Sequence, residues 1–168
     1  MRILGVDPGS IHLGYAVVES KGGQLRSISH GTISAPRSLP LADRLPILYD
    51  GLVEVLDQTQ PESAGLERVF TALNPASALT LGQARGVVVL ALGQRQVELA
   101  EYGPGEVKLA VGGHGRSSKD QVARMVGRLL GLPTEELRSD TTDALAIAIC
   151  HCHGLDRARL VSRAERNR

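Results

Sequence analysis

Apolar residues along the chain form short β-like runs and longer helical repeats, and their order outlines a mixed α/β domain. Strands are predicted where apolar or β-branched runs end at Gly, Pro or an acidic residue, and helices where apolar residues recur every three or four positions. The predicted strands cover residues 3–6, 13–18, 24–34, 63–66 and 96–101. The predicted helices cover residues 41–56, 75–93, 107–111, 119–130 and 140–152.

The connections between these elements predict how the sheet is built. Asp7-Pro8-Gly9-Ser10 ends the first strand, and Gly22-Gly23 separates the next two strands. Two short connections in succession are typical of antiparallel neighbours, and the strand–helix alternation that follows is typical of a mixed sheet with helices on its faces. We expect an α/β fold with a five-stranded mixed sheet in a single domain over residues 1–155. A basic, flexible tail is expected over residues 156–168.

Composition and charge narrow the class of protein. Hydrophobic residues make up 42% of the 168 positions, enough for one core. No run of about 18 apolar residues appears, and Asp7 comes too early for a signal peptide, so we expect a cytoplasmic protein without a membrane partner. The net charge is only +1, but residues 104–134 and 156–168 each contain five basic and two acidic residues. This distribution fits a phosphate-binding face, although solvated helix faces would give the same counts.

The segment Cys150-His151-Cys152-His153 contains both cysteines of the chain. The cysteines are too close in sequence to join distant parts of the chain by a disulfide. Zinc sites usually have wider ligand spacings and a second pair of ligands. We therefore interpret the segment as the end of an apolar core helix.

Four acidic residues occupy positions that suggest a shared site. Asp7 and Glu67 each end an apolar strand, and Asp140 and Asp143 open the last helix on one face, three residues apart. If the first and fourth strands are neighbours, the start of the last helix can pack over their ends. Each acid also has an ordinary structural explanation: a turn for Asp7, a surface position for Glu67, a helix cap for Asp140 and a dipole-favoured first turn for Asp143.

The combination of four carboxylates predicts a metal centre more strongly than any single one does. Clustered carboxylates repel each other and are costly to bury, so a divalent cation is the usual compensation. Ligands that are all oxygen favour Mg²⁺ or Mn²⁺ over zinc. Two such ions about 4 Å apart support phosphodiester hydrolysis by water. The pattern therefore predicts metal-dependent phosphoryl transfer.

Motifs in order along residues 3 to about 153 resemble the RuvC family of Holliday-junction resolvases. They are Gly5-Val6-Asp7-Pro8-Gly9-Ser10 with Gly14-Tyr15, Glu67-Arg68-Val69-Phe70, Ser77-Ala78-Leu79-Thr80-Leu81-Gly82-Gln83-Ala84-Arg85-Gly86, and Asp140-Thr141-Thr142-Asp143-Ala144-Leu145-Ala146-Ile147-Ala148 with Cys152-His153. The first motif alone is weak, whereas the full set is highly specific.

The resemblance implies a ribonuclease-H-like fold and a homodimeric endonuclease that makes paired symmetric nicks in four-way DNA junctions during recombination and repair. It implies that Asp7, Glu67, Asp140 and Asp143 are catalytic and hold two Mg²⁺ ions, with Mn²⁺ as a substitute. Some family members carry His at the position of Asp140. The family works beside the RuvA and RuvB branch-migration proteins.

The resemblance also suggests which residues contact DNA. Phe70 follows Glu67 by three positions and matches an aromatic that can stack on a base, although a lone aromatic is usually a core residue. Lys108 and Lys119 match basic positions that face DNA. Arg85 lies in the third motif, and Arg116 lies in a Gly-rich loop that is not a Walker A motif. We expect these five residues to bind junction DNA.

Three other functions fit parts of the pattern. Asp-x-Gly-Ser after a first strand is also typical of actin-like ATPases and sugar kinases, which need two such lobes and a longer chain. A related nuclease could act on RNA or on another DNA structure. A DNA-binding module with non-catalytic acids is a further alternative, and it would bind junctions without metal-dependent cutting.

Overall fold

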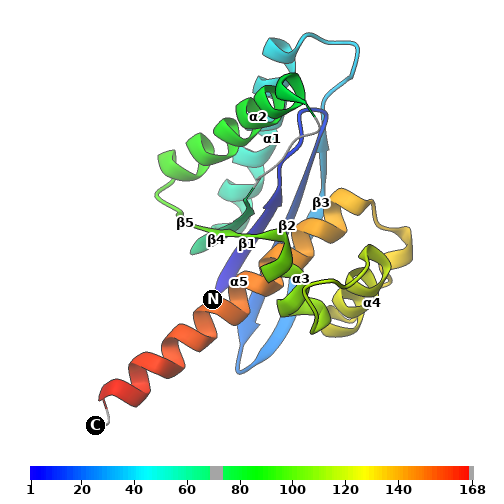
Figure 1. Cartoon of the computed structure of the whole chain (residues 1–168). Coiled ribbons are helices and arrows are strands. Elements are labelled where there is room, and N and C mark those ends of the chain that lie inside the picture. Colours follow the sequence, from blue (N-terminus) through cyan, green and yellow to red (C-terminus); the bar gives the residue numbers. More distant parts are fainter. Residues whose placement is uncertain (69–73, 167–168) are drawn as a thin grey trace.

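A mixed five-stranded sheet forms the centre of the computed structural model, which describes residues 1–68 and 74–166 (Figure 1). Its strands are β1 (Arg2–Asp7), β2 (His12–Lys21), β3 (Gln24–Ser34), β4 (Ser63–Glu67) and β5 (Glu98–Tyr102). The spatial order is β3-β2-β1-β4-β5. The first three strands are antiparallel, and β4 and β5 run parallel to β1. The predicted mixed sheet, with β1 and β4 as neighbours, is confirmed.

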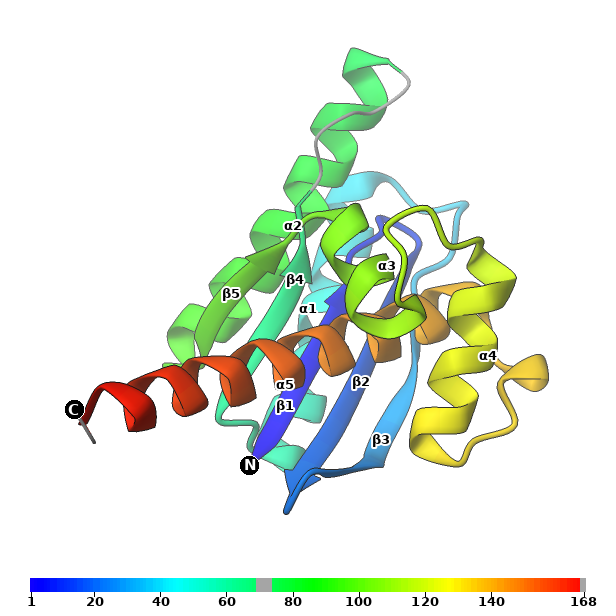
Figure 2. The ribbon, with the colours of Figure 1, turned by 60° about the horizontal axis from the view of Figure 1, so that its bottom comes forward.

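Helices cover both faces of this sheet. They are α1 (Leu41–Thr59), α2 (Pro75–Gln94), α3 (Pro104–Gly112), α4 (Lys119–Leu130) and α5 (Ser139–Arg166), with a 3₁₀ turn, η1 (Thr134–Glu136), before α5. Figures 1 and 2 show α1 and α2 on one face and α3, α4 and α5 on the other. Alternate residues of β1 serve the two cores: Ile3 packs with α5, whereas Leu4 and Val6 pack with α1 and α2.

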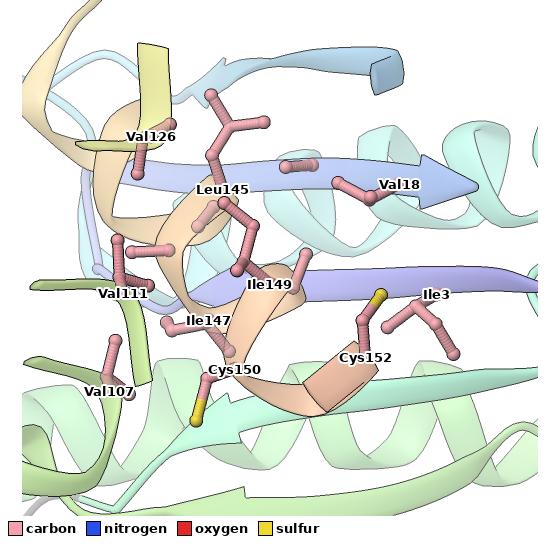
Figure 3. Packing of buried hydrophobic residues seen from close by; sticks show 14 of the residues in the cluster. Ile3, Val18, Val107, Val111, Val126, Leu145, Ile147, Ile149, Cys150 and Cys152 are labelled. Atoms are coloured by element: carbon pink, nitrogen blue, oxygen red, sulfur yellow. The ribbon is translucent and has the colours of Figure 1, made fainter. Parts of the chain in front are cut away.

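Close packing of α5 on the strands depends on small residues. A Cβ at Gly5 would overlap the backbone of Ala144 and Ala148, and one at Gly14 would overlap the backbone of Asp140. The bare backbone of β1 and β2 therefore forms the seat on which α5 rests. Apolar side chains of α5 then meet those of α3 and α4 on its other sides (Figure 3). The seat brings the first turn of α5 directly over the end of β1.

Local signals fix the ends of α4 at Lys119 and Leu130. The Ser118 hydroxyl accepts a hydrogen bond from the backbone N–H of Gln121, and the side-chain oxygen of Gln121 accepts one from the backbone N–H of Ser118. This reciprocal capping box satisfies amides that a helix start leaves unpaired. Gly131 has a φ of 65° and ends the helix in the left-handed conformation that favours glycine. The predicted bounds of this helix are confirmed.

The C-terminal segment differs from its prediction. The sequence predicted a last helix that ends at Cys152, but α5 continues to Arg166, so this helix end is wrong. Gly154 lies within the helix, and a Cβ at that position would approach the Tyr102 hydroxyl to 3.1 Å, so glycine allows close packing there. The predicted flexibility of the basic segment 156–168 stays a prediction.

Smaller differences follow from local geometry. β5 begins at Glu98 and not at Gln96, because Gln96 has a φ of 55°, which interrupts a strand. α3 begins three residues earlier than predicted, because Pro104 occupies its first turn, a favoured place for proline. The turn η1 had no sequence signal.

Helix α2 is apolar on more than its buried face. By length and composition alone this helix is apolar enough to cross a membrane, and 22% of its most apolar 18-residue stretch is buried in the domain. The predicted absence of a continuous run of about 18 apolar residues still holds, because Ser, Thr, Gln and Arg interrupt the apolar sequence of the helix. The helix nevertheless packs Ala84, Val88, Ala91 and Leu92 into the domain. Three of its large apolar side chains, Leu79, Val89 and Leu90, are exposed.

Candidate active site

The four predicted carboxylates come from three elements that meet at one end of the sheet. Asp7 is the last residue of β1 and pairs with Gly14 of β2. Glu67 ends β4, whose preceding residue Leu66 pairs with Val6 of β1. Asp140 and Asp143 lie in the first turns of α5, and the seat at Gly14 holds the Asp140 backbone against β2.

The charges of these carboxylates act on one another. Burial, followed by the negative charges of Asp143, Glu67 and Asp140 in that order, raises the pKa of Asp7 to about 7. Burial and the charge of Asp143 also raise the pKa of Glu67. Such mutual repulsion marks a site that is built to receive positive charge.

Two predicted lysines lie beside the acids. The Nζ atom of Lys119 donates to Oδ2 of Asp143 at 3.0 Å, and this hydrogen bond raises the pKa of Lys119. Lys119 and Lys108 both lower the pKa of Glu67 by their charge. A cavity of about 200 Å³ is lined by Glu67, Asp143, both lysines and the apolar residues Pro104, Val107, Val122, Ala146 and Ile147. We call it the acidic cavity.

The donor set fits a hard divalent cation. Within residues 1–68 and 74–166, no three carboxylate, imidazole or thiolate side chains are close enough to hold one metal ion together. The carboxylates are nevertheless close enough to raise the pKa of Asp7 jointly, and their ligand atoms are all oxygen. Side-chain rotations can bring these oxygens together while the backbone of β1, β4 and α5 stays fixed. Oxygen ligands with unbalanced negative charge favour Mg²⁺ or Mn²⁺.

Arg85 lies at the site but is engaged by protein atoms. Its side chain is 19% exposed, and it donates to the backbone carbonyl of Glu67 at 2.6 Å and to the carboxylate of Glu101. Arg85 thus ties α2 to the end of β4. The predicted contact between Arg85 and DNA is untested, and the observed contacts indicate that Arg85 positions Glu67.

One anchoring contact had no sequence signal. The hydroxyl groups of Thr32 in β3 and Thr141 in α5 are 2.9 Å apart and form a hydrogen bond. This bond joins the third strand to the turn that carries Asp140 and Asp143. Its partners are 109 residues apart in the chain, so only the sheet order reveals it.

The other two predicted DNA contacts are Arg116 and Phe70. Arg116 does not line the acidic cavity but a separate hollow beside α4. Phe70, the predicted stacking residue, lies outside the described residues, and its role stays a prediction.

The fold and the carboxylates together define a class. A mixed sheet in this order, with acids at the ends of β1 and β4 and at the start of the helix that covers them, is that of a ribonuclease-H-like nuclease. The family described as "Crossover junction endodeoxyribonuclease RuvC" matches residues 3–151, and the chain belongs to this family. The family is one of metal-dependent nucleases, so the predicted endonuclease class is confirmed and the ATPase-lobe alternative is set aside.

Relatives match nearly the whole chain. The crossover junction endodeoxyribonuclease RuvC of Thermomicrobium roseum is 48% identical over 151 residues, which cover 90% of this chain and 92% of the relative. The protein of the same name from Myxococcus xanthus is 49% identical over 156 residues, covering 92% of this chain and 82% of the relative. The solved structure of T. thermophilus RuvC in complex with Holliday junction substrate is 35% identical, with a TM-score of 0.85, and the match covers 90% of this chain and 93% of that one.

Proposed function

We propose that this chain resolves four-way DNA junctions by paired symmetric nicks, and that Asp7, Glu67, Asp140 and Asp143 hold the divalent cations for the reaction. The observation that carries the proposal is the meeting of four acids at one end of the sheet: Asp7 and Glu67 end the neighbouring strands β1 and β4, and α5, which starts with Asp140 and Asp143, packs on β1 and β2. The three other carboxylates help to raise the pKa of Asp7. A structural acid at a turn would not be surrounded in this way. Family membership supports the choice of a DNA junction as substrate.

Two Mg²⁺ ions, or Mn²⁺ in their place, would supply an activated water and stabilise the oxygen that leaves the scissile phosphate. The residues of the chain prepare the place for that reaction. Lys108 and Lys119 line the acidic cavity and offer ammonium donors to the phosphate oxygens. The apolar side chains of Val107, Val122 and Ile147 form part of its wall, which lowers the local dielectric and strengthens these charge interactions.

We propose that the active unit is a homodimer joined through the outer face of α2. Leu79, Val89 and Leu90 on this helix are 67%, 42% and 54% exposed. Gly82 and Gly86 have no atom within 4 Å of an added Cβ, so a second helix can approach the backbone closely there. A two-fold dimer places two acidic cavities against a nearly two-fold junction, which gives paired cuts.

Sedimentation of Leu90→Glu tests the dimer. We expect the variant to be a monomer that binds junctions weakly and makes single, unpaired nicks. Leu160→Glu is the matched control, because Leu160 is 67% exposed on α5, away from α2. If the Leu90→Glu protein stays dimeric, the proposed interface through α2 is wrong.

Family membership also supports a role beside the RuvA and RuvB branch-migration proteins, in the cytoplasm. Mixing the purified proteins with a junction tests this association. Cleavage positions that shift when RuvA and RuvB move the junction would support the association. Cleavage positions and rates that are the same with and without the two proteins would contradict it.

The experiment that tests the main proposal is cleavage of a synthetic four-way junction. Duplex, single-stranded and RNA–DNA hybrid substrates serve as controls, each with Mg²⁺, Mn²⁺ or chelator. Symmetric, metal-dependent nicks confined to the junction are expected, and Asp7→Asn should abolish them while junction binding persists. If only a control substrate is cleaved, the nuclease activity would be supported and the assignment of a four-way junction as its substrate would be wrong.

A further inference from the structure

A second hollow lies beside α4, on a different face from the acidic cavity. Its volume is about 940 Å³, and it is lined by the loop after α3 and by one face of α4. Gln121, Arg124, Met125 and Arg128 line it at the spacing that one helix face requires. Lys119 and Val122 of the same helix line the acidic cavity instead. Helix α4 thus separates the two sites.

The hollow gathers positive charge that the protein does not balance. Arg116, Arg124 and Arg128 all line it and are exposed, and none of its lining residues is acidic. Within the part of the chain that the structure describes, these three guanidinium groups form no ion pair. Arg85 and Arg95, in contrast, are each paired with a carboxylate.

Three unpaired guanidinium groups around one hollow repel each other, and an anion relieves that repulsion. The planar guanidinium fork binds phosphate oxygens through paired hydrogen bonds. No Phe, Tyr or Trp lines the hollow, and its single imidazole, that of His114, is outnumbered by the three guanidinium groups. The chemistry favours the backbone phosphates of a nucleic acid, bound without reading its sequence.

The distance between the hollow and the acidic cavity along α4 sets how many nucleotides separate the phosphates that the two sites would bind. Arg128 follows Lys119 by nine residues, which is about 14 Å along a helix axis. Phosphates on one DNA strand are about 3.4 Å apart along the duplex axis. A strand that passes from the acidic cavity along α4 would present a phosphate to the hollow about four nucleotides away.

We propose that Arg116, Arg124 and Arg128 form a second phosphate-binding site that holds one arm of the junction about four nucleotides from the cut. The inference rests on the proposed function, because it takes a four-way junction as the ligand. It assigns Arg124 and Arg128 a role, and it places Arg116 in arm binding and not at the cutting centre.

Junction binding in chelator tests the site without requiring cleavage. The double variant Arg124→Gln/Arg128→Gln is compared with Lys21→Gln/Arg26→Gln, which removes the same charge from exposed positions near the turn at Gly22-Gly23. We expect the α4 variant to bind about tenfold more weakly and the slope of log affinity against log salt to become shallower by about two. The control should retain nearly the wild-type slope. Equal slopes for the two variants would overturn the proposal.

Neutral methylphosphonate linkages locate the contact. A linkage placed three to five nucleotides from the cut should weaken wild-type binding several-fold and leave the α4 variant almost unchanged. Equal losses for both proteins would place the contact elsewhere and overturn the proposal. A wild-type protein that shows the expected binding pattern but cuts no junction would leave the arm site standing and remove the proposed nuclease function.

Discussion

Lys119 and Asp143 form an ion pair, Nζ to Oδ2 at 3.0 Å, that joins the start of α4 to the start of α5 at the acidic cavity. Lys119 thereby brings positive charge to a cluster in which burial and neighbouring carboxylates raise the pKa of Asp7 and Glu67. The pair links α4, which carries the proposed arm-binding site, to α5, which carries two of the proposed metal ligands.

Replacement of Lys119 by Gln should slow junction cutting by about 100-fold, the usual cost of losing one preorganised donor at a developing charge. Junction binding should weaken much less, because one phosphate contact of several is lost. Single-turnover cleavage and binding in chelator separate the two effects. Lys21→Gln is the control, and a cleavage rate equal to wild type would exclude Lys119 from the reaction.

Asp7 should make the metal-free protein less stable as the pH rises. Its pKa is about 7 in the folded protein against an ordinary value of 3.8, so the folded state holds a proton that the unfolded chain releases between these values. The resulting stability is complete below pH 3.8 and is lost as the pH passes 7. In chelator at pH 8, Asp7→Asn should therefore be more stable than wild type, by at most about 4 kcal/mol.

Urea denaturation at pH 5 and pH 8 measures this difference. The advantage of Asp7→Asn should be smaller at pH 5, and saturating Mg²⁺ should reduce it at pH 8 by binding the wild type. An advantage that does not change with pH would mean that the Asp7 carboxyl is not buried among other acids.

Arg85→Gln should lower the cleavage rate about tenfold while changing junction affinity less than about twofold. The reason is that Arg85 binds the Glu67 backbone and pairs with Glu101. Its loss should displace the Glu67 carboxylate without removing a contact to a DNA phosphate. Cleavage rate and the salt dependence of binding are measured together. A weaker affinity with a shallower salt slope would instead support the original prediction that Arg85 contacts DNA.

Gly5→Ala should destabilise the protein by about 3 kcal/mol or more, because the added methyl overlaps the backbone of Ala144 and Ala148 in α5. Gly105→Ala is the matched control, since no atom lies within 4 Å of a Cβ at that position. Thermal unfolding followed by circular dichroism compares the two. Equal melting temperatures would mean that α5 does not rest on the β1 backbone.

The sequence was sufficient to predict the carboxylate cluster because its members mark ends of regular elements. Asp7 and Glu67 end apolar strands, and Asp140 and Asp143 start a helix, so the order of elements alone indicated that they could meet. The sheet order and its neighbouring β1 and β4 then confirmed the arrangement.

Features that depend on tertiary contacts could not be predicted in this way. The bond between Thr32 and Thr141 and the contact from Arg85 to Glu67 join residues far apart in sequence, and no periodicity marks them. The continuation of α5 beyond Cys152 was missed, and the close approach of Tyr102 to Gly154 inside the helix is a tertiary contact that no periodicity marks. Arg116 was predicted as a DNA contact without its partners, because only the fold brings Arg124 and Arg128 to the same hollow.

The seat of α5 on Gly5 and Gly14 also has a consequence for motion. Since α5 rests on strand backbone, its first turns and the end of β1 cannot separate without opening the core around Leu145 and Ile149. Amide protons near Asp7 and in α5 from Ala144 to Ile149 should therefore exchange with solvent only when the whole domain unfolds. Asp7, Asp140 and Asp143, three of the proposed metal ligands, are thus carried by the slowest-exchanging part of the protein.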